Sequence, residues 1–229
     1  CRYFNRKGCR KTIGNLSYVK TPEGIEKKSF EIIEENVDKS NFDSKDWNIV
    51  RRVIHTTADF EFANLLKLSP GAIEAGILAI QKGCRIYTDT RMAEAGINKK
   101  ALKQLGCEVL CMVDDVQVLE MANREGITRS MASIIMASKF PDIKIYVLGN
   151  APTALFKLIE LIREGKANPD LIIGVPVGFV GAAESKEELS KLSVPHIITK
   201  GQKGGSTIAA AIVNALMYMS LEEKTLKDG

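Results

Sequence analysis

The sequence predicts an α/β fold, with a buried, doubly wound parallel sheet, helices on both of its faces and an N-terminal helical layer. From residue 84 onward, short apolar runs rich in branched residues alternate with stretches of helical periodicity. This alternation is typical of a parallel sheet that is covered on both faces. No internal repeat, low-complexity tract or Pro/Gly-rich linker interrupts the chain, so we expect one domain rather than two independent ones.

The part of the chain before residue 84 has the pattern of helices. Pro22 suits the first turn of a helix, and apolar residues recur at helical spacing over residues 25–37. The stretch NFDSKDW, residues 41–47, offers helix-start residues ahead of a second apolar stripe. Ser69-Pro70 predicts a further start, with a capping hydroxyl before a proline at the first helical position, and Gly83 is expected to end that helix.

The later part of the chain supplies the sheet. Strands are expected over residues 84–89, 108–114, 143–149, 171–177 and 196–200. Helices are expected between and after them, over residues 100–106, 115–126, 130–140, 152–165, 185–192 and 208–219. The crossovers that join parallel strands should be right-handed.

The net charge of +4 comes from the first twenty residues, which carry six basic residues and no acidic one. The rest of the chain has 26 basic and 28 acidic residues, so we expect no nucleic-acid partner. We interpret residues 1–17 as a flexible basic extension and residues 18–229 as the single α/β domain.

The number and spacing of the cysteines and the length of the apolar runs indicate the cellular compartment of the protein. Five cysteines stand at irregular spacing without a CxxC pair, and only two histidines accompany them, which disfavours a structural zinc site. An odd number of unpaired thiols suits a cytoplasmic protein, and Cys84, Cys107 and Cys111 are expected to be buried apolar residues. No apolar run reaches membrane-spanning length, and we expect no membrane partner.

Polar and glycine-rich segments follow the expected strands, where ligands bind in sheets of this kind. They include Thr88, Asn150, Gly178 and the segment KGQKGGST at residues 200–207. Glycine beside a helix start could hold an anion through backbone N–H groups, or could simply make a tight turn. The usual phosphate fingerprints GxxxxGK[ST] and GxGxxG are absent.

His55 stands in the stretch VRRVIHTTADF. On a helical wheel, Trp47, Ile49, Val50, Val53 and Ile54 share one apolar arc, and His55 lies outside it. The pattern leaves three interpretations open: a solvated surface residue, a core residue satisfied by the backbone, or a residue facing a ligand or a second subunit. A histidine is suited to moving a proton near neutral pH. His196, beside Pro195 at a strand start, is interpreted as structural, and residues 56–59 as a weak capping box for the next helix.

Several segments together resemble one known family. The segments are EKKSFEII, RRVIHTTADFEFA, SPGAIEAG, TDTRMAEAGI, LGNAPTALFKLIELI, IIGVPVGFVGAAESKEEL and KGGSTIAAAIVNAL. In this order they resemble the precorrin-8X (cobalt-precorrin-8) methylmutases of cobalamin biosynthesis, from about Tyr18 to Met219.

The resemblance implies a flavodoxin-like three-layer α/β/α fold, a homodimer and an isomerase. The family moves a methyl group from carbon 11 to carbon 12 of precorrin-8 or cobalt-precorrin-8, giving hydrogenobyrinate or cobyrinate, with no cofactor. Any cobalt is carried by the tetrapyrrole substrate, so no protein metal site is expected. His55 matches the catalytic histidine, which protonates or hydrogen-bonds a ring nitrogen. Lys28-Ser29 and Arg129 match substrate contacts.

Further substrate contacts are expected from the polar and glycine-bearing strand ends. These are Thr88, Asn150, Gly178, Lys203, Gly204 and Gly205. Two other functions stay open at this point. One is a non-catalytic corrinoid-binding or carrier protein of the same fold, which would bind the product without turnover. The other is a nucleotide- or flavin-dependent oxidoreductase, which the absent phosphate fingerprints disfavour.

Overall fold

A computed structural model describes residues 19–228, and the predicted extension at residues 1–17 lies outside the described residues. The strands form a six-stranded sheet in the order β1-β6-β5-β4-β2-β3. They are β1 (Leu66–Leu68), β2 (Arg85–Thr88), β3 (Glu108–Leu110), β4 (Ile143–Leu148), β5 (Leu171–Gly174) and β6 (His196–Thr199). The strands β2 to β6 are parallel, and counted from β2 their order is 2-1-3-4-5. This is the flavodoxin-like order, so the predicted fold class is confirmed.

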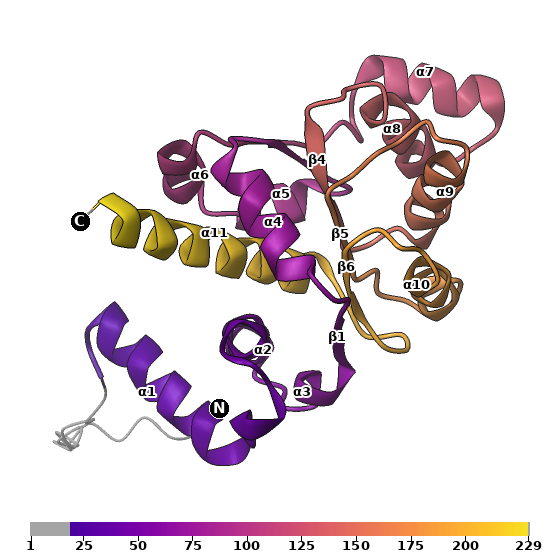
Figure 1. Cartoon of the computed structure of the whole chain (residues 1–229). Helices are drawn as coiled ribbons and strands as arrows, with labels where there is room; N and C mark the ends of the chain where they lie inside the picture. Colours follow the sequence, from indigo (N-terminus) through magenta and orange to yellow (C-terminus); the bar gives the residue numbers. More distant parts are fainter. Residues whose placement is uncertain (1–18, 229) are drawn as a thin grey trace, which may run out of the picture.

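Helices cover both faces of the sheet (Figure 1). They are α1 (Pro22–Asn36), the short 3₁₀ helix η1 (Lys39–Asn41), α2 (Ser44–Thr57), α3 (Phe62–Leu65), α4 (Ala72–Gln81), α5 (Arg91–Gly96), α6 (Lys99–Leu105), α7 (Val116–Glu125), α8 (Arg129–Ala137), α9 (Pro152–Arg163), α10 (Ala182–Ser190) and α11 (Ser206–Asp228). Helices α4, α5, α6 and α11 pack on one face, and α7 to α10 pack on the other.

The predicted N-terminal helical layer is made by α1 and α2. Helix α2 packs against α11, and α1 packs against the far side of α2. All five residues of the predicted apolar arc of α2 are buried, from Trp47 to Ile54. This face buries α2 in the core, while its other side remains available to α1.

Four short elements were not delimited from the sequence: η1, α3, α5 and the edge strand β1. Strand β1 has only three residues and runs antiparallel to β6, with Leu66 opposite Thr199. So short a segment has no readable periodicity, and its pairing with β6 comes from tertiary contacts. The expected strand over residues 108–114 is also shorter than predicted, because β3 ends at Leu110.

The predicted helix start at Ser69-Pro70 is wrong by two residues. Helix α4 begins at Ala72, and Gly71 precedes it with a left-handed φ of 75°. Instead of capping α4, the Ser69 hydroxyl accepts a hydrogen bond of 2.8 Å from the backbone N–H of His196. Ser69 therefore anchors the β1–α4 connection to β6.

The remaining structural predictions on buried residues are confirmed. Cys84, Cys107 and Cys111 are buried free thiols. His196 is also buried, and its Nδ1 lies 2.8 Å from the carbonyl oxygen of Val194. Within residues 19–228, no helix combines the length and apolar character that crossing a membrane requires.

Candidate active site

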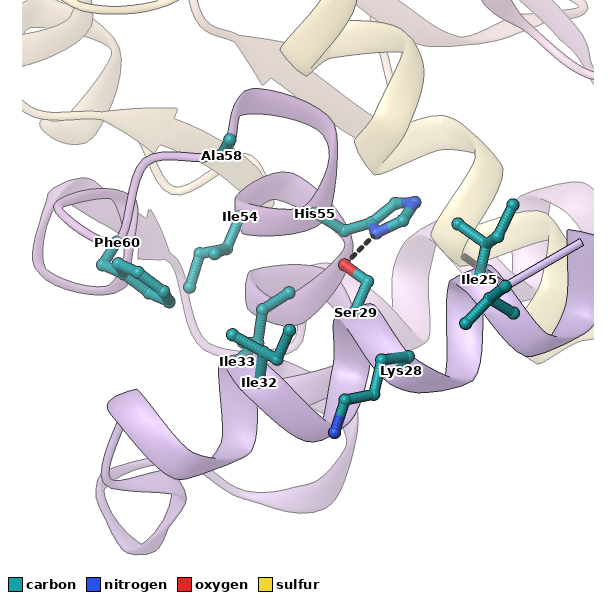
Figure 2. Close-up of a pocket in the computed structure, with 10 residues that line it drawn as sticks. Ile25, Lys28, Ser29, Ile32, Ile33, Ile54, His55, Ala58 and Phe60 are labelled. Atoms are coloured by element: carbon teal, nitrogen blue, oxygen red, sulfur yellow. Dashed lines mark hydrogen bonds between the residues drawn. The ribbon is translucent and has the colours of Figure 1, made fainter. Parts of the chain in front are cut away.

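A cavity of about 420 Å³ opens between α1, α2 and the linker that follows α2. We call it the His55 cavity (Figure 2). It is lined by Val19, Ile25, Lys28, Ser29, Ile32, Ile33, Ile54, His55, Ala58 and Phe60. The lining is apolar apart from three side chains, and these three are the predicted site residues of the helical layer. The structure thus brings Lys28, Ser29 and His55 together.

His55 is half-buried and held by α1. Its Nδ1 forms a hydrogen bond of 2.7 Å with the Ser29 hydroxyl, as Figure 2 shows. The ring of Phe30 meets the imidazole edge to face, with centroids 5.4 Å apart. Among the described residues, no hydrogen bond reaches Nε2 of His55, and that nitrogen is left for a ligand.

Two arginines hold Phe30 from the side of α2. The guanidinium carbons of Arg51 and Arg52 lie 4.2 and 5.1 Å from the centre of its ring. Arg51 also bonds Glu34 at 3.1 Å, and Arg52 bonds Glu26, so both arginines bridge α1 and α2. These bridges fix the helix pair that carries Ser29 and His55.

Lys28 lies at the rim of the His55 cavity. Its side chain is 56% exposed, and its ammonium pairs with Glu31 at 3.3 Å, one turn along α1. An exposed pair of this kind contributes little to stability. Lys28 can therefore exchange Glu31 for an anionic ligand at small cost.

The end of α2 differs from the capping box predicted for residues 56–59. The Thr56 and Thr57 hydroxyls donate to the carbonyl oxygens four residues earlier in α2, at 2.9 Å each. Ala58 then takes a left-handed φ of 52° and ends the helix. Both threonines thus belong to the last turn of α2, and the next helix, α3, has no side-chain cap. The sharp turn directs Ala58 and Phe60 to the His55 cavity.

Thr88 and Asn150 lie at the carboxyl edge of the sheet. The buried Thr88 hydroxyl donates to the carbonyl oxygen of Leu110 at 3.4 Å, between strands. Asn150 is exposed after β4, and its backbone N–H donates to the carboxylate of Asp89 at 2.8 Å. Gly149 and Ala151 donate to the same carboxylate at 2.9 Å each. Burial raises the pKa of Asp89, whereas the three N–H donors act in the opposite direction.

Two loops meet at the same sheet edge, and we call residues 175–181 and 200–205 the glycine loops. Gly178 donates its N–H to the carbonyl oxygen of Gln202 at 3.1 Å, and Gly205 donates to that of Val175 at 2.9 Å. At Gly204 a side chain has no room, since a Cβ atom would stand 2.2 Å from the oxygen of Val175. The predicted residues Gly178, Gly204 and Gly205 are therefore brought together by backbone contact.

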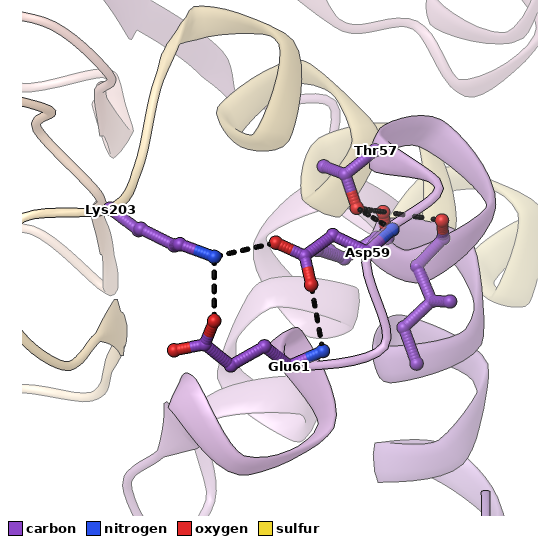
Figure 3. Close-up of polar contacts among 6 residues, drawn as sticks. Thr57, Asp59, Glu61 and Lys203 are labelled. Carbon is purple, nitrogen blue, oxygen red and sulfur yellow. Dashed lines mark hydrogen bonds and ion pairs between the residues drawn. The ribbon is translucent and has the colours of Figure 1, made fainter.

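Lys203 extends from the second glycine loop toward the α2–α3 linker (Figure 3). Its ammonium lies 2.7 Å from a carboxylate oxygen of Asp59 and 2.7 Å from one of Glu61. Hydrogen bonding to these carboxylates raises the pKa of Lys203, and the Lys203 ammonium lowers the pKa of Asp59. Lys203 thus joins the glycine loop to the linker that lines the His55 cavity.

Arg129 stands at the start of α8 with an exposed side chain. Its guanidinium lies 3.7 Å from Asp114, which also pairs with Arg91 at 3.2 Å. Arg91 also pairs with Glu94 at 3.0 Å, so Arg129 shares with Arg91 a cluster that contains two arginines and two carboxylates. The structure does not place Arg129 among the residues of the His55 cavity.

Some polar residues near these loops are not among the predicted substrate contacts. Lys186 of α10 is buried, although a lysine in the stretch SKEELSKL has the pattern of a solvated helix. Thr90 and Ser206 form a hydroxyl–hydroxyl hydrogen bond of 2.8 Å between the start of α5 and that of α11. Asp89 had one available signal, since it directly follows an apolar strand. Over residues 19–228, no cluster of three or more His, Cys, Asp or Glu could hold a metal ion.

Comparisons with known proteins agree with these features. The precorrin-8X methylmutase family model matches residues 24–219. A cobalt-precorrin-8 methylmutase of Leptospira interrogans is 48% identical, over 86% of this chain and 93% of the relative. A precorrin-8X methylmutase of Pseudomonas aeruginosa is 37% identical, over 88% and 97%. The solved structure of a precorrin-8X methylmutase from Thermus thermophilus superposes with a TM-score of 0.81 and 41% identity, over 88% and 97% of the two chains. The chain therefore belongs to the precorrin-8X methylmutase family, whose members are isomerases of cobalamin biosynthesis.

Proposed function

We propose that this chain moves a methyl group from carbon 11 to carbon 12 of precorrin-8 or cobalt-precorrin-8. The product is then hydrogenobyrinate or cobyrinate. The observation that carries the proposal is the Ser29–His55 pair, which stands in an apolar cavity and has one imidazole nitrogen, Nε2, to which none of residues 19–228 makes a hydrogen bond. The relatives described above are named as methylmutases, which favours catalysis over the carrier alternative.

The reaction balances within one molecule. The bond between carbon 11 and the methyl group breaks, the bond to carbon 12 forms, and the ring double bonds rearrange. No electron is gained or lost overall, so we propose that no cofactor takes part. Any cobalt belongs to the substrate ring.

His55 is the proposed catalytic residue, acting through Nε2 on a ring nitrogen of the substrate. A proton or hydrogen bond at that nitrogen stabilises the charge that develops as the double bonds move. Acid–base help of this kind contributes about 10²–10⁴-fold in rate. The remaining acceleration must come from holding the ring in a reactive geometry.

Ser29 can hydrogen-bond to either protonation state of Nδ1 of His55. A hydroxyl can turn to donate or to accept, so it can match either state of Nδ1. When the Ser29 hydroxyl donates to Nδ1, the proton of a neutral imidazole must be on Nε2, which then donates to the substrate. When Ser29 accepts instead, it stabilises the doubly protonated ring that would give up the Nε2 proton.

The cavity suits one part of the substrate and the sheet edge suits another. Ile25, Ile32 and Phe60 are 51%, 43% and 43% exposed around His55, and such apolar side chains fit a macrocycle. The acetate and propionate groups of a tetrapyrrole need cations and N–H donors. Lys28, Arg129, Asn150 and the glycine loops are proposed to supply them. Helices α5, α9, α10 and α11 all begin at this edge, and their N-termini favour anions.

We also propose that the chain works as a homodimer in the cytoplasm. The exposed apolar side chains around His55 form a surface that a second copy of the chain can cover together with the substrate. Phe179 and Val180 of the first glycine loop are 89% and 88% exposed and offer a second such surface. Size-exclusion chromatography with light scattering should give twice the chain mass, and a monomer at micromolar concentration would contradict the dimer.

The test of function is turnover of precorrin-8 and cobalt-precorrin-8 side by side, followed by absorbance. Conversion of either compound at many turnovers per chain is expected. A carrier protein would bind the coloured product tightly but leave precorrin-8 unchanged. If the chain binds both compounds and converts neither, the proposed reaction is wrong. If it converts one of them faster, that compound shows whether the preferred substrate contains cobalt.

A further inference from the structure

Lys186 is a charged side chain buried on α10 with only 2% of its surface exposed. Among residues 19–228 it forms no ion pair with a carboxylate, and its ammonium instead meets three uncharged oxygens. It donates to the carbonyl oxygens of Pro176 at 3.1 Å and Lys203 at 2.9 Å, and to the Thr199 hydroxyl at 3.2 Å. Burial lowers the pKa of Lys186 to about 8. A charge held in such surroundings is unfavourable unless its hydrogen bonds are complete.

Two of the three oxygens belong to the two glycine loops, one to each loop, and the third belongs to the end of β6. Pro176 belongs to the loop after β5, Thr199 ends β6, and Lys203 belongs to the loop after β6. The three N–H bonds of the ammonium match the three acceptors one to one. The Thr199 hydroxyl also donates to the carbonyl oxygen of Lys203 at 2.7 Å. The ammonium therefore ties one loop to the other at a point where neither has a regular strand partner.

Lys203 connects this ammonium to the His55 cavity: its carbonyl oxygen accepts from Lys186, and its side chain extends toward the linker that lines the cavity. From the carbonyl that Lys186 holds, the Lys203 side chain reaches the carboxylates of Asp59 and Glu61 at 2.7 Å. Phe60 stands between those two residues and lines the cavity. A continuous set of contacts thus runs from α10 through the second glycine loop to the cavity wall. Figure 3 shows the part of it that joins Lys203 to Asp59 and Glu61.

We infer that Lys186 is a positioning residue for substrate binding, which fixes the backbone at Lys203 and, through Asp59 and Glu61, the Phe60 side of the His55 cavity. The inference rests on the proposed role of the glycine loops and the cavity in holding the substrate. Lys186 does not line the cavity itself. Its effect on the substrate must pass through Lys203.

The first experiment replaces Lys186 by methionine, which keeps an unbranched apolar stem but removes the three donors. Lys191→Met is the matched control, because it removes an exposed lysine at the end of the same helix. With precorrin-8 as substrate, KM should rise about tenfold in Lys186→Met while kcat per folded molecule changes by less than about twofold. A merely structural role would lower the folded fraction and leave KM unchanged, and that result would overturn the inference.

A double-mutant cycle tests the path through Lys203. Lys203→Met should raise KM in the wild-type background but add little in the Lys186→Met background, because the two changes interrupt one set of contacts. Fully additive effects on KM would show that Lys186 does not act through Lys203. If Lys203→Met leaves KM unchanged, both the proposed role of the second glycine loop in substrate binding and the inference about Lys186 are wrong. If Lys203→Met raises KM and Lys186→Met does not, the inference alone fails.

Thr199 decides the matter if Lys186→Met does not fold. Thr199→Val removes the hydroxyl that accepts from Lys186 and donates to Lys203, at nearly constant volume. We expect it to raise KM severalfold, and Thr199→Ser should restore the wild-type KM because it returns the hydroxyl. A wild-type KM in folded Thr199→Val would contradict the inference that the contacts of Lys186 and Thr199 with Lys203 position the loop for substrate binding.

Discussion

The His55 cavity and the glycine loops are built in opposite ways. The cavity consists of side chains on two helices and their flanking segments, and two of its polar residues, Ser29 and His55, form one short hydrogen bond. The glycine loops instead contact each other through their backbones, and the buried ammonium of Lys186 binds carbonyl oxygens of both loops. At Gly204 the backbones are so close that there is no space for a side chain. The two regions are joined by Lys203 and its two carboxylates.

The difference indicates a division of work. A reactive group needs one defined side chain in a cavity whose apolar walls accept a ring, and neighbouring walls can vary as long as they stay apolar. Recognition of several carboxylates needs N–H groups in fixed positions. A backbone that is held in place by hydrogen bonds and close contacts tolerates few substitutions. Changes in the cavity should therefore act on kcat, and changes in the loops should act on KM and on stability.

The largest effect is expected for His55→Ala. Removal of the imidazole should lower kcat by about 10²–10⁴-fold, because the proposed proton or hydrogen bond to the ring nitrogen is lost. KM for precorrin-8 should change little, since the apolar walls remain. His196→Gln is the control, because His196 lies away from the cavity, and its kcat per folded molecule should stay normal. Turnover by His55→Ala at the wild-type rate would exclude the catalytic role.

The loop region should show a pH-dependent stability that originates at Lys186. The pKa of Lys186 in the folded chain is about 8, below its ordinary value of 10.5. Between these values the unfolded chain binds a proton that the folded chain has lost, so the free energy of unfolding rises with pH. Below pH 8 both states are protonated, and the full cost of burying the charge is present.

Urea unfolding of wild type and Lys186→Met from pH 7.5 to 10.5 measures how much of the pH dependence of the unfolding free energy comes from Lys186. The difference in unfolding free energy should shift in favour of the wild type by up to about 3 kcal/mol. The same comparison with Lys191→Met should show no such slope, because that lysine is exposed in both states. A flat difference for Lys186→Met would mean that the buried amine keeps its ordinary proton affinity.

Gly204→Ala should damage both stability and binding. The new Cβ atom would stand 2.2 Å from the oxygen of Val175 and 2.7 Å from that of Pro176, so the loops must separate. We expect a loss of about 2–3 kcal/mol in unfolding free energy and a higher KM. Gly165→Ala is the matched control, since Gly165 lies outside the glycine loops and has a φ of +69°, and no atom of the described residues would lie within 4 Å of its added Cβ. It should cost about 1 kcal/mol and leave KM unchanged.

The sequence predicted the parallel part of the sheet because each of its strands is a continuous apolar run between helical segments. It could not show β1, since the three residues Leu66–Leu68 become a strand only through pairing with β6. The end of α2 was misjudged for a related reason. Thr56 and Thr57 have the composition of a cap, and only the left-handed turn at Ala58 shows that they bond backward into their own helix.

The sequence named side chains of the candidate site but could not show the contacts that connect them. The helical wheel placed His55 outside the core arc, and the family resemblance named Lys28 and Ser29, which the packing of α1 on α2 brings to it. The carboxylate partners of Lys203 lie 144 and 142 residues away in the chain, so no local pattern could reveal them. Lys186 was missed because a lysine between polar helix neighbours carries no sign of burial until the loops above it are known.

Ser29→Ala is the smallest change and the finest test of the comparison. It removes a single hydrogen bond to Nδ1 of His55 and leaves the imidazole in an otherwise intact cavity. Loss of one such bond should lower kcat about tenfold, well short of the effect of His55→Ala, with KM nearly constant. Ser29→Thr returns a hydroxyl and should recover most of the lost rate. If Ser29→Ala instead raises KM and spares kcat, the hydroxyl contacts the substrate rather than the imidazole, and the cavity would bind by the same means as the loops.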